Sequence, residues 1–243
     1  MKRIVLTLAV LMVAAGAAAE VQKTDVDIKS SDVTLKGTYF SPGRPGPAML
    51  LLHQCNMDRH AWDTLAADLA AAGIHVLAID YRGYGESGGE KLTDAAARRA
   101  SMQQKWPGDV DTAYEYLVAQ QGVDKAHVAA GGASCGVTQS SDLAARHHDV
   151  KTLVLLSGNA TDTTKAYIAQ TPALAVFGAA SDGDGNAAKA IKEIVEASKH
   201  PQSVAKIYSG TEHGVPMFAK NPDLEPTIVA WLKARLTAKT GTN

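Results

Sequence analysis

A serine between two glycines is the strongest chemical signal in this sequence. The run Gly132-Ala-Ser134-Cys-Gly136 matches the pattern G-x-S-x-G and directly follows an apolar stretch. In this pattern the serine lies on a sharp turn from a strand into a helix, where its hydroxyl stands free and only small residues fit two positions away on either side. The run predicts Ser134 as the nucleophile of an acyl-transfer reaction. A glycine-rich turn without a catalytic role is the alternative.

A serine nucleophile needs a general base, and His213 is the best-placed of the eight histidines. It stands in the run Gly210-Thr-Glu-His-Gly214, which we expect to be a loop just after the final strand. The other histidines fall in or beside predicted helices and strands, or in a turn before proline. An imidazole carried on such a loop can reach the serine. The alternative is an ordinary surface histidine.

An acidic residue must orient the imidazole and support its charged form. Asp182 and Asp184 both follow the apolar run 173–177, and Asp182 is preferred because it lies closer to the predicted strand end. The same stretch also resembles a calcium loop, with Asn186 and Glu193 as further oxygen ligands. Ala187 stands where that loop requires glycine, and a strand precedes it instead of a helix, so calcium binding is not favoured.

Two further runs adjoin predicted strand ends. Leu51-Leu52-His53-Gln54-Cys55-Asn56 ends a buried strand, and its loop offers a backbone N–H that can face an acyl oxygen. The residue after the nucleophile, Cys135, would supply a second N–H, and two such donors form an oxyanion hole. We expect His53 itself to be structural. The turn-rich run from Asp80 to Gly88 is likewise expected to brace the site.

Strand-like and helix-like segments alternate along the chain, which predicts a parallel sheet covered by helices on both faces. Chemistry in such sheets gathers beyond the carboxyl ends of the strands. The predicted strands are 24–29, 33–40, 48–53, 74–79, 126–130, 152–156, 173–177 and 204–208. The predicted helices are 62–72, 91–104, 109–120, a segment ending near 147, 187–197 and 227–236.

Residues 1–19 have the layout of a secretory signal peptide. Lys2 and Arg3 precede an apolar run, and Ala17-Ala18-Ala19 is a small-residue cleavage site. The apolar run is too short to span a bilayer core of about 30 Å, and no cysteine follows the cleavage site to carry a lipid anchor. We therefore expect a periplasmic or secreted protein without a membrane anchor, in which residues 20–243 form one domain.

Charge excludes some classes of partner. The full chain has a net charge of −1, and residues 1–19 hold two of its cations and no acid, which leaves −3 for the rest. No run of Lys or Arg exceeds two residues, so nothing attracts nucleic acid or an anionic membrane electrostatically. We expect a small-molecule partner.

Together these motifs resemble the α/β-hydrolase family, and most closely its small enzymes grouped with dienelactone hydrolases and simple esterases. The resemblance rests on LLHQC, HVLAIDYRGYGESGG, GGASCG, the aspartate after a late strand and EHG, in an order that covers roughly residues 24–238. It implies an α/β fold with a mostly parallel eight-stranded sheet. It also implies ester hydrolysis through an acyl-enzyme, with a Ser-Asp-His triad and with no metal or cofactor. The short segment between Leu156 and Ala173 leaves no room for a cap domain, which predicts an open site for small or accessible esters.

This chain departs from the family pattern at two positions. Gln54 stands where glycine is usual, and Val137 where glycine or alanine is common. Dienelactone hydrolases use a cysteine nucleophile, but Cys135 would lie between Ala133 and Val137, which fit the turn poorly. Serine catalysis is therefore preferred to cysteine catalysis.

The resemblance also places the chain's two cysteines, Cys55 and Cys135, at the two oxyanion-hole positions. There they would face each other, either as a disulfide or as two buried thiols. Two alternatives to an esterase stay open: a non-catalytic binding protein of the same fold, and a peptidase or thioesterase built on it.

Overall fold

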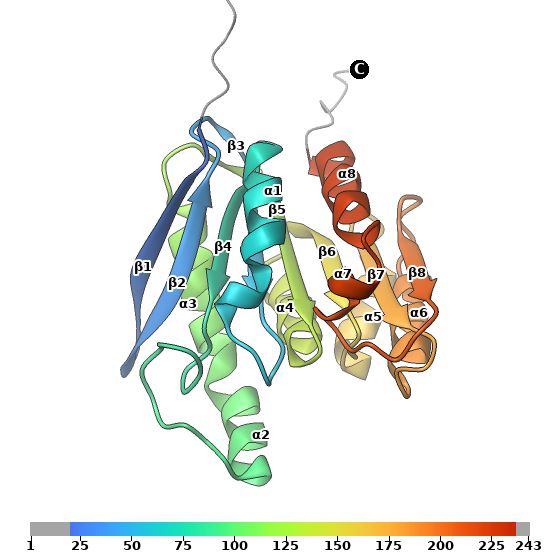
Figure 1. Cartoon of the computed structure of the whole chain (residues 1–243), viewed down its shortest axis with the longest axis horizontal. Helices are drawn as coiled ribbons and strands as arrows, with labels where there is room; N and C mark the ends of the chain where they lie inside the picture. Colours follow the sequence, from blue (N-terminus) through green and yellow to red (C-terminus); the bar gives the residue numbers. More distant parts are fainter. Residues whose placement is uncertain (1–19, 237–243) are drawn as a thin grey trace, which may run out of the picture.

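The computed structural model describes residues 20–236. The predicted signal peptide and the end of the predicted domain, residues 237–243, lie outside the described residues. The described chain forms one eight-stranded sheet with helices on both faces (Figure 1). Its strands are β1 (Gln22–Ser30), β2 (Val33–Ser41), β3 (Gly46–Leu52), β4 (His75–Ile79), β5 (Val123–Ala133), β6 (Val150–Leu156), β7 (Ala175–Ser181) and β8 (Val204–Tyr208).

The sheet has the order β1-β2-β4-β3-β5-β6-β7-β8. β1 and β2 form an antiparallel hairpin at one edge, and β2 also runs antiparallel to β4. The remaining neighbours are parallel. From β3 the chain passes to β4 on one side and then to β5 on the other, so the strand order reverses between β3 and β5. Open α/β sheets bind ligands in the crevice at such a reversal.

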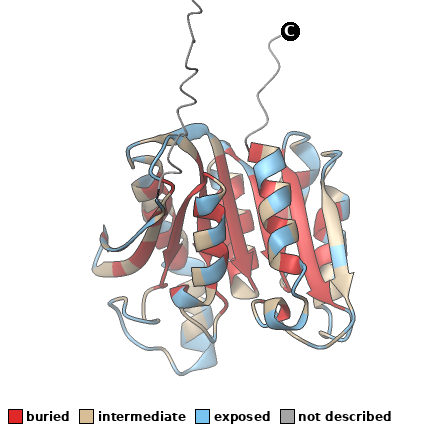
Figure 2. Ribbon diagram, turned by 45° about the horizontal axis from the view of Figure 1, so that its top comes forward, coloured by how far each residue is buried: buried red, intermediate tan, exposed pale blue. Residues whose placement is uncertain are grey.

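Two helical layers enclose the sheet, and the strands at its centre are buried (Figure 2). One layer packs its apolar side chains with Leu50, Leu77 and Val128 and consists of α3 (Trp106–Val118), α4 (Cys135–Arg146), α5 (Asp162–Gln170) and α6 (Ala187–Ala197). The other packs with Met49, Val76 and Phe177 and consists of α1 (Asp63–Ala71), α7 (Met217–Lys220) and α8 (Leu224–Leu236). The helix α2 (Ala95–Gln104) buries only Ser101 and projects beyond the carboxyl ends of β3 and β5 (Figure 1).

The predicted fold is confirmed, because each of the eight predicted strands corresponds to an observed one. The helices α5 and α7 were not predicted. α5 buries only Thr164 and Ile168 over nine residues, so it lacks a clear apolar stripe, and α7 is a four-residue turn. Among the described residues, α5 is the only helix between β6 and β7, and no cap domain lies there.

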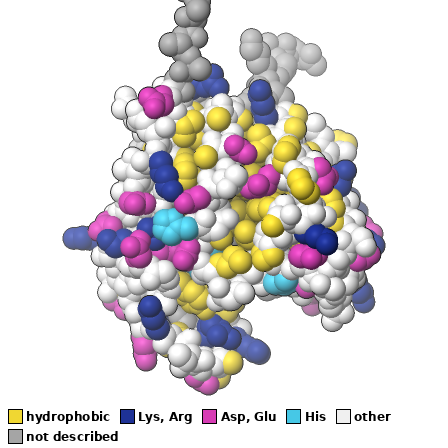
Figure 3. Space-filling model, viewed as in Figure 1, with side chains coloured by type: hydrophobic (Ala, Val, Ile, Leu, Met, Phe, Trp, Pro, Cys, Tyr) yellow, Lys and Arg dark blue, Asp and Glu magenta, His cyan; other side chains and the backbone are white. Residues whose placement is uncertain are grey.

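The outer surface mixes charge and apolar groups. Figure 3 shows hydrophobic side chains gathered over α1 and α8, with acidic and basic side chains interspersed. None of the helices in the range 20–236 is both long and apolar enough to cross a membrane.

Candidate active site

Ser134 lies between the end of β5 and the start of α4, at the point where the strand order reverses. Its backbone has φ 53° and ψ −117°, a left-handed conformation that non-glycine residues rarely adopt. Its N–H donates to the carbonyl of Leu156 on β6 at 2.9 Å. Such strain persists only where the surroundings enforce it, and it often marks a functional position.

Close packing around the serine explains the two glycines of the motif. A Cβ at Gly132 would lie 2.1 Å from the carbonyl oxygen of Gly136, and a Cβ at Gly136 would lie 2.3 Å from that of Leu52. Val137, the unusually large residue in this turn, fits because residue 158 is glycine: a Cβ at Gly158 would lie 2.5 Å from the Val137 Cβ. The turn therefore has the tight geometry that the sequence predicted for a nucleophile.

The imidazole of His213 pairs with Asp184, which corrects the preference for Asp182. Nδ1 of His213 lies 2.8 Å from Asp184 Oδ2 and 3.0 Å from Oδ1. Asp182 instead accepts the backbone N–H of Gly210 at 3.0 Å, so its carboxylate shapes the loop that carries the histidine. The turn after β7 places Asp184, two positions beyond Asp182, beside the imidazole. When Nδ1–H is donated to Asp184, Nε2 keeps a lone pair that can accept a proton.

Several contacts hold the loop that carries His213. Gly183 donates its N–H to the Gly210 carbonyl at 2.8 Å, and the buried Ser181 hydroxyl donates to the carbonyl of Glu212 at 2.8 Å. These bonds join the end of β7 to the residues that precede the histidine. The loop is therefore anchored to the sheet, although the side chain of His213 is itself 44% exposed.

A disulfide joins Cys55 to Cys135, with 5.9 Å between their Cα atoms. Cys55 follows β3 by three residues and Cys135 opens α4, and Leu52 and Gly132 are register partners in the parallel pair β3–β5. The sequence left open a disulfide or two buried thiols for this pair, and the structure has the disulfide. A cysteine nucleophile does not fit, because the Cys135 sulfur is bonded to another sulfur. The backbone N–H groups of both cysteines donate to no carbonyl in the described turns and loops, as an oxyanion hole requires.

Gln54 joins the end of β3 to the loop that carries His213. Its side chain is buried; Oε1 accepts the N–H of Val215 at 2.9 Å, and Nε2 donates to Asn56 Oδ1 at 2.7 Å. A Cβ at Gly214 would lie 2.3 Å from the same Oε1, so this glycine allows the approach. The sequence marked Gln54 only as a departure from the family pattern, because its partner lies 161 residues away.

His53 and Asp80 are structural, as expected. His53 Nδ1 donates to its neighbour's carbonyl at 2.7 Å, and Nε2 accepts the N–H of Tyr81 at 3.2 Å. Burial lowers the pKa of His53, which agrees with this neutral form. Asp80 is fully buried and ion-paired with Arg59, and it accepts the N–H groups of Arg59 and Glu86 at 2.7 and 3.0 Å.

Ser134, Asp184 and His213 line one open pocket of about 450 Å³. The other residues of its wall are Cys135, Thr138, Ser157, Gly158, Asn159, Gly185, Asn186, Ala187 and Ala190. They are small or neutral polar residues, with neither Lys nor Arg among them. No sequence motif pointed to this wall, because it combines the loop after β6 with the start of α6.

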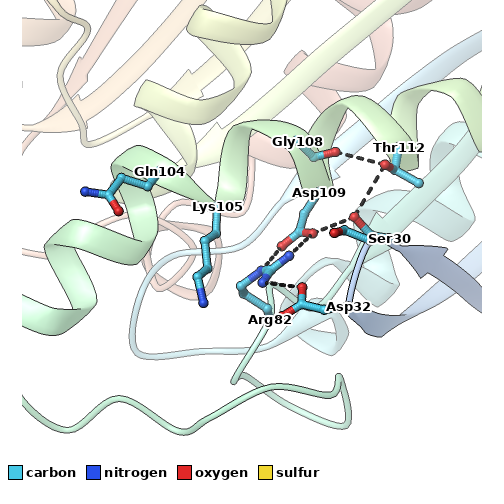
Figure 4. Close-up of a pocket in the computed structure, with 9 residues that line it drawn as sticks. Ser30, Asp32, Arg82, Gln104, Lys105, Gly108, Asp109 and Thr112 are labelled. Carbon is cyan, nitrogen blue, oxygen red and sulfur yellow. Dashed lines mark hydrogen bonds and ion pairs between the residues drawn. The ribbon is translucent and has the colours of Figure 1, made fainter.

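A second pocket, of about 410 Å³, lies between the β1–β2 turn and α3 (Figure 4). Arg82 fills its centre and forms two bonds to Asp109, at 2.5 and 2.7 Å, and one to Asp32 at 3.0 Å. Both carboxylates of this pocket are therefore ion-paired with Arg82, and its lining includes neither histidine nor cysteine. The pocket beside Ser134 is the better candidate for chemistry.

Neither a metal nor a cofactor was expected. Among the described residues, no group of three His, Cys, Asp or Glu side chains is placed to hold a metal ion. Asp182 and Asp184, which the calcium-loop alternative would use, are engaged with Gly210 and His213 instead.

Solved structures share this fold. A predicted CIB-like hydrolase from Thermoplasma acidophilum superimposes with a TM-score of 0.70 at 17% identity, covering 88% of this chain and 99% of that one. An esterase of Pyrococcus furiosus gives a TM-score of 0.69 at 18% identity, covering 89% and 92%. A dienelactone hydrolase from Anabaena variabilis gives 0.66 at 18% identity, covering 89% and 99%.

Sequence comparison gives both a relative and a family. An uncharacterised protein of Mycobacterium tuberculosis is 34% identical over 123 residues, which is 49% of this chain but only 40% of the length of that relative. The profile of the α/β-hydrolase fold family matches residues 47–181, more than half of the chain. This match includes the Ser134 turn and both strands of the reversal, and the chain belongs to the α/β-hydrolase family.

Proposed function

We propose that this protein is a serine hydrolase that cleaves small carboxylic esters. The observation that carries the proposal is the Asp184–His213 pair, which shares one open pocket with a serine in a strained strand-to-helix turn. A nucleophile, a base and a group that orients the base are the parts that acyl transfer needs. The resemblance to esterases of the same fold agrees with this reading.

In the proposed mechanism the Ser134 hydroxyl attacks the ester carbonyl carbon, and His213 Nε2 takes the hydroxyl proton. Asp184 holds Nδ1–H and stabilises the imidazolium. The oxyanion is bound by the N–H groups of Cys55 and Cys135. His213 then gives the proton to the leaving alcohol, which departs and leaves an acyl-serine. A water molecule, deprotonated by His213, hydrolyses the acyl-serine and frees the acid.

The pocket wall supports small neutral substrates. Gly158, Gly185 and Ala190 line the pocket with small or absent side chains. The volume of about 450 Å³ suits a short acyl or alcohol group better than a long chain. Asp184 is the acidic residue among those that line the pocket. Neither Lys nor Arg lines the pocket to bind a carboxylate. We expect neutral short-chain esters to be preferred.

Hydrolysis of p-nitrophenyl esters of increasing chain length by wild type and by Ser134→Ala tests the mechanism. We expect the variant to lose on the order of 10⁴- to 10⁶-fold in kcat. Equal rates in both proteins would discard the serine mechanism, and rates no higher than uncatalysed hydrolysis in both would favour a binding protein. A thioester or an amide hydrolysed faster than every ester would favour the thioesterase or peptidase alternative.

A matched pair of esters tests the charge preference. p-Nitrophenyl butyrate and p-nitrophenyl hemisuccinate have acyl chains of similar length, but only the second carries a carboxylate. We expect kcat/KM to be at least about tenfold higher for the butyrate, because the anion lies near Asp184 without a counterion. A preference for the hemisuccinate would contradict this description of the pocket.

We also propose export through a cleaved signal peptide. The basic start, the apolar run and the small-residue site at Ala17-Ala18-Ala19 support it. The Cys55–Cys135 disulfide agrees with it, because disulfides persist mainly in oxidising compartments. Cell fractionation and amino-terminal sequencing test it: we expect a periplasmic or secreted product that begins at Glu20, and an uncleaved cytoplasmic product would overturn it.

A further inference from the structure

We propose that the Cys55–Cys135 disulfide is a clasp that positions both oxyanion donors, so that ester hydrolysis depends on the redox state of this bond. The oxidised enzyme is the fast form and the reduced enzyme the slow one. The inference rests on the proposed serine mechanism and adds to it a covalent positioning element and a mode of regulation.

The location of the bond is the first argument. It crosses the point where the strand order reverses and links the loop after β3 to the first residue of α4. Cys135 directly follows the nucleophile and lines its pocket. Both bonded residues are also those whose N–H groups are free to bind the oxyanion. The bond therefore fixes the distance between two donors that come from segments 80 residues apart.

The two ends of the bond differ in rigidity. The Ser134 turn cannot shift easily, since the backbones of Gly136 and Leu52 are in close contact. The residues after Gln54 are less constrained: Cys55, Met57 and Asp58 are partly exposed, and Asn56 is exposed. Any change in the length of the link is therefore absorbed mainly by the loop that carries the Cys55 N–H.

Reduction lengthens the link. Bonded sulfurs lie about 2.05 Å apart, whereas unbonded heavy atoms rest at about 3.5–4.0 Å. Each sulfur already touches a neighbour on the protein side, since Cys55 Sγ lies 3.9 Å from Met102 Sδ and Cys135 Sγ 3.8 Å from the His53 carbonyl. The loop then moves outward with its N–H, and the oxyanion loses one aligned donor.

The redox step uses a dithiol as the reductant. One thiolate of the dithiol attacks a sulfur of the disulfide, breaks the S–S bond and forms a mixed disulfide. Its second thiolate attacks that mixed disulfide, and the reagent leaves as a cyclic disulfide. Two electrons pass to the protein, and Cys55 and Cys135 each end with a protonated sulfur. Both residues are partly exposed, so a small dithiol has access.

Steady-state kinetics before and after dithiothreitol treatment test the proposal. Iodoacetamide trapping and intact-mass analysis count the free thiols, and circular dichroism selects a temperature at which the reduced protein stays folded. We expect kcat to fall by about tenfold or more with little change in KM, short of the 10²–10³ that loss of a whole donor costs. Reoxidation should restore kcat. Full reduction with unchanged kcat would overturn the proposal.

The double variant Cys55→Ala/Cys135→Ala is the matched control, because it keeps both N–H donors and removes the link together with the two sulfurs. We expect its kcat to fall below that of the oxidised wild type, because the loop that carries the Cys55 N–H loses its covalent hold, and not to respond to dithiothreitol. Wild-type kcat in this variant would overturn the clasp. If the variant loses activity with dithiothreitol as the wild type does, the redox effect lies elsewhere in the protein. That result would also overturn the clasp.

Labelling with a fluorophosphonate separates failure of this inference from failure of the proposed function. This probe reacts with an activated serine without requiring the right ester. Labelling of the oxidised protein at Ser134 that slows on reduction supports the clasp even if no tested ester is cleaved. Equal labelling rates in both redox states overturn the clasp alone. No labelling in either state overturns the serine mechanism and the inference with it.

Discussion

At the scale of single residues, the proposed mechanism depends on the orientation of one imidazole. His213 is carried on a loop and its side chain is 44% exposed, so packing alone does not fix the ring. Asp184, only 15% exposed, meets Nδ1 with both carboxylate oxygens at 2.8 and 3.0 Å. In the proposed mechanism this pair keeps the proton on Nδ1 and leaves Nε2 as the base.

Replacement of the triad acid gives a direct prediction. Asp184→Asn should lower kcat by roughly 10²- to 10⁴-fold, since an amide that donates to Nδ1 stabilises the wrong tautomer and does not support the imidazolium. Asp182→Asn is the control: its side chain still accepts the Gly210 N–H, and kcat should stay within about threefold of wild type. Steady-state kinetics of both variants on one short ester decides which of the two aspartates is the acid. A larger loss in Asp182→Asn would restore Asp182 as the acid.

The sequence predicted Ser134 and His213 more readily than it predicted their acid. The serine carries a local motif whose steric reason lies within five residues, and Gly132 and Gly136 show that packing. The choice between Asp182 and Asp184 depends on how the turn after β7 meets the loop after β8. That contact is made by Gly183 and Gly210, which are far apart in the chain.

At the scale of elements, the end of β3 connects the parts of the site. Gln54 bonds to the backbone of Val215, two residues after His213, and Cys55 bonds to the start of α4. The base and the nucleophile come from distant segments, so a shared support keeps their distance constant. Alternation in polarity predicted β1 and β2, and apolar runs predicted most of the other strands, but no local pattern marks a bond between residues 161 positions apart.

Gln54→Met tests this support, because methionine keeps the length of the side chain and removes the acceptor. We expect kcat to fall by roughly tenfold with KM little changed, since the Val215 N–H loses its partner and the loop carrying His213 loosens. Gln121→Met, at an exposed position, controls for the general effect of the substitution. Rescue by Gln54→Glu, which keeps an acceptor oxygen, would separate positioning from packing. A wild-type kcat in Gln54→Met would remove the positioning role.

At the scale of the whole molecule, the disulfide also affects stability. It closes a loop of 80 residues and so restricts the unfolded chain. Reduction, or Cys55→Ala/Cys135→Ala, should lower the free energy of unfolding by about 2–4 kcal/mol. Urea unfolding of oxidised and reduced protein measures the change, and Ser134→Ala in its oxidised form serves as a control that keeps the bond. An unchanged midpoint would show that the bond does not contribute to the stability of the folded protein.

The buried neutral His53 links stability to pH. Burial lowers the pKa of His53 below its ordinary value of 6.5, so between that value and its folded pKa the unfolded chain binds a proton that the folded chain does not. The contribution of His53 to stability is therefore complete above about pH 6.5 and is lost as the pH falls toward the folded pKa. His75 and His200, whose pKa values are also lowered by burial, add to the same trend.

His53→Asn isolates the share of this one group. The amide of asparagine can still donate to the Gln54 carbonyl but does not titrate. Between pH 7 and 5.5 we expect the unfolding free energy of wild type to fall more steeply than that of the variant. The difference should be at most about 1.4 kcal/mol per pH unit, the limit for one proton. Urea midpoints at several pH values provide the slopes. Parallel slopes would mean that His53 takes up its proton in the folded state as readily as in the unfolded chain, which would break its bond from the Tyr81 N–H.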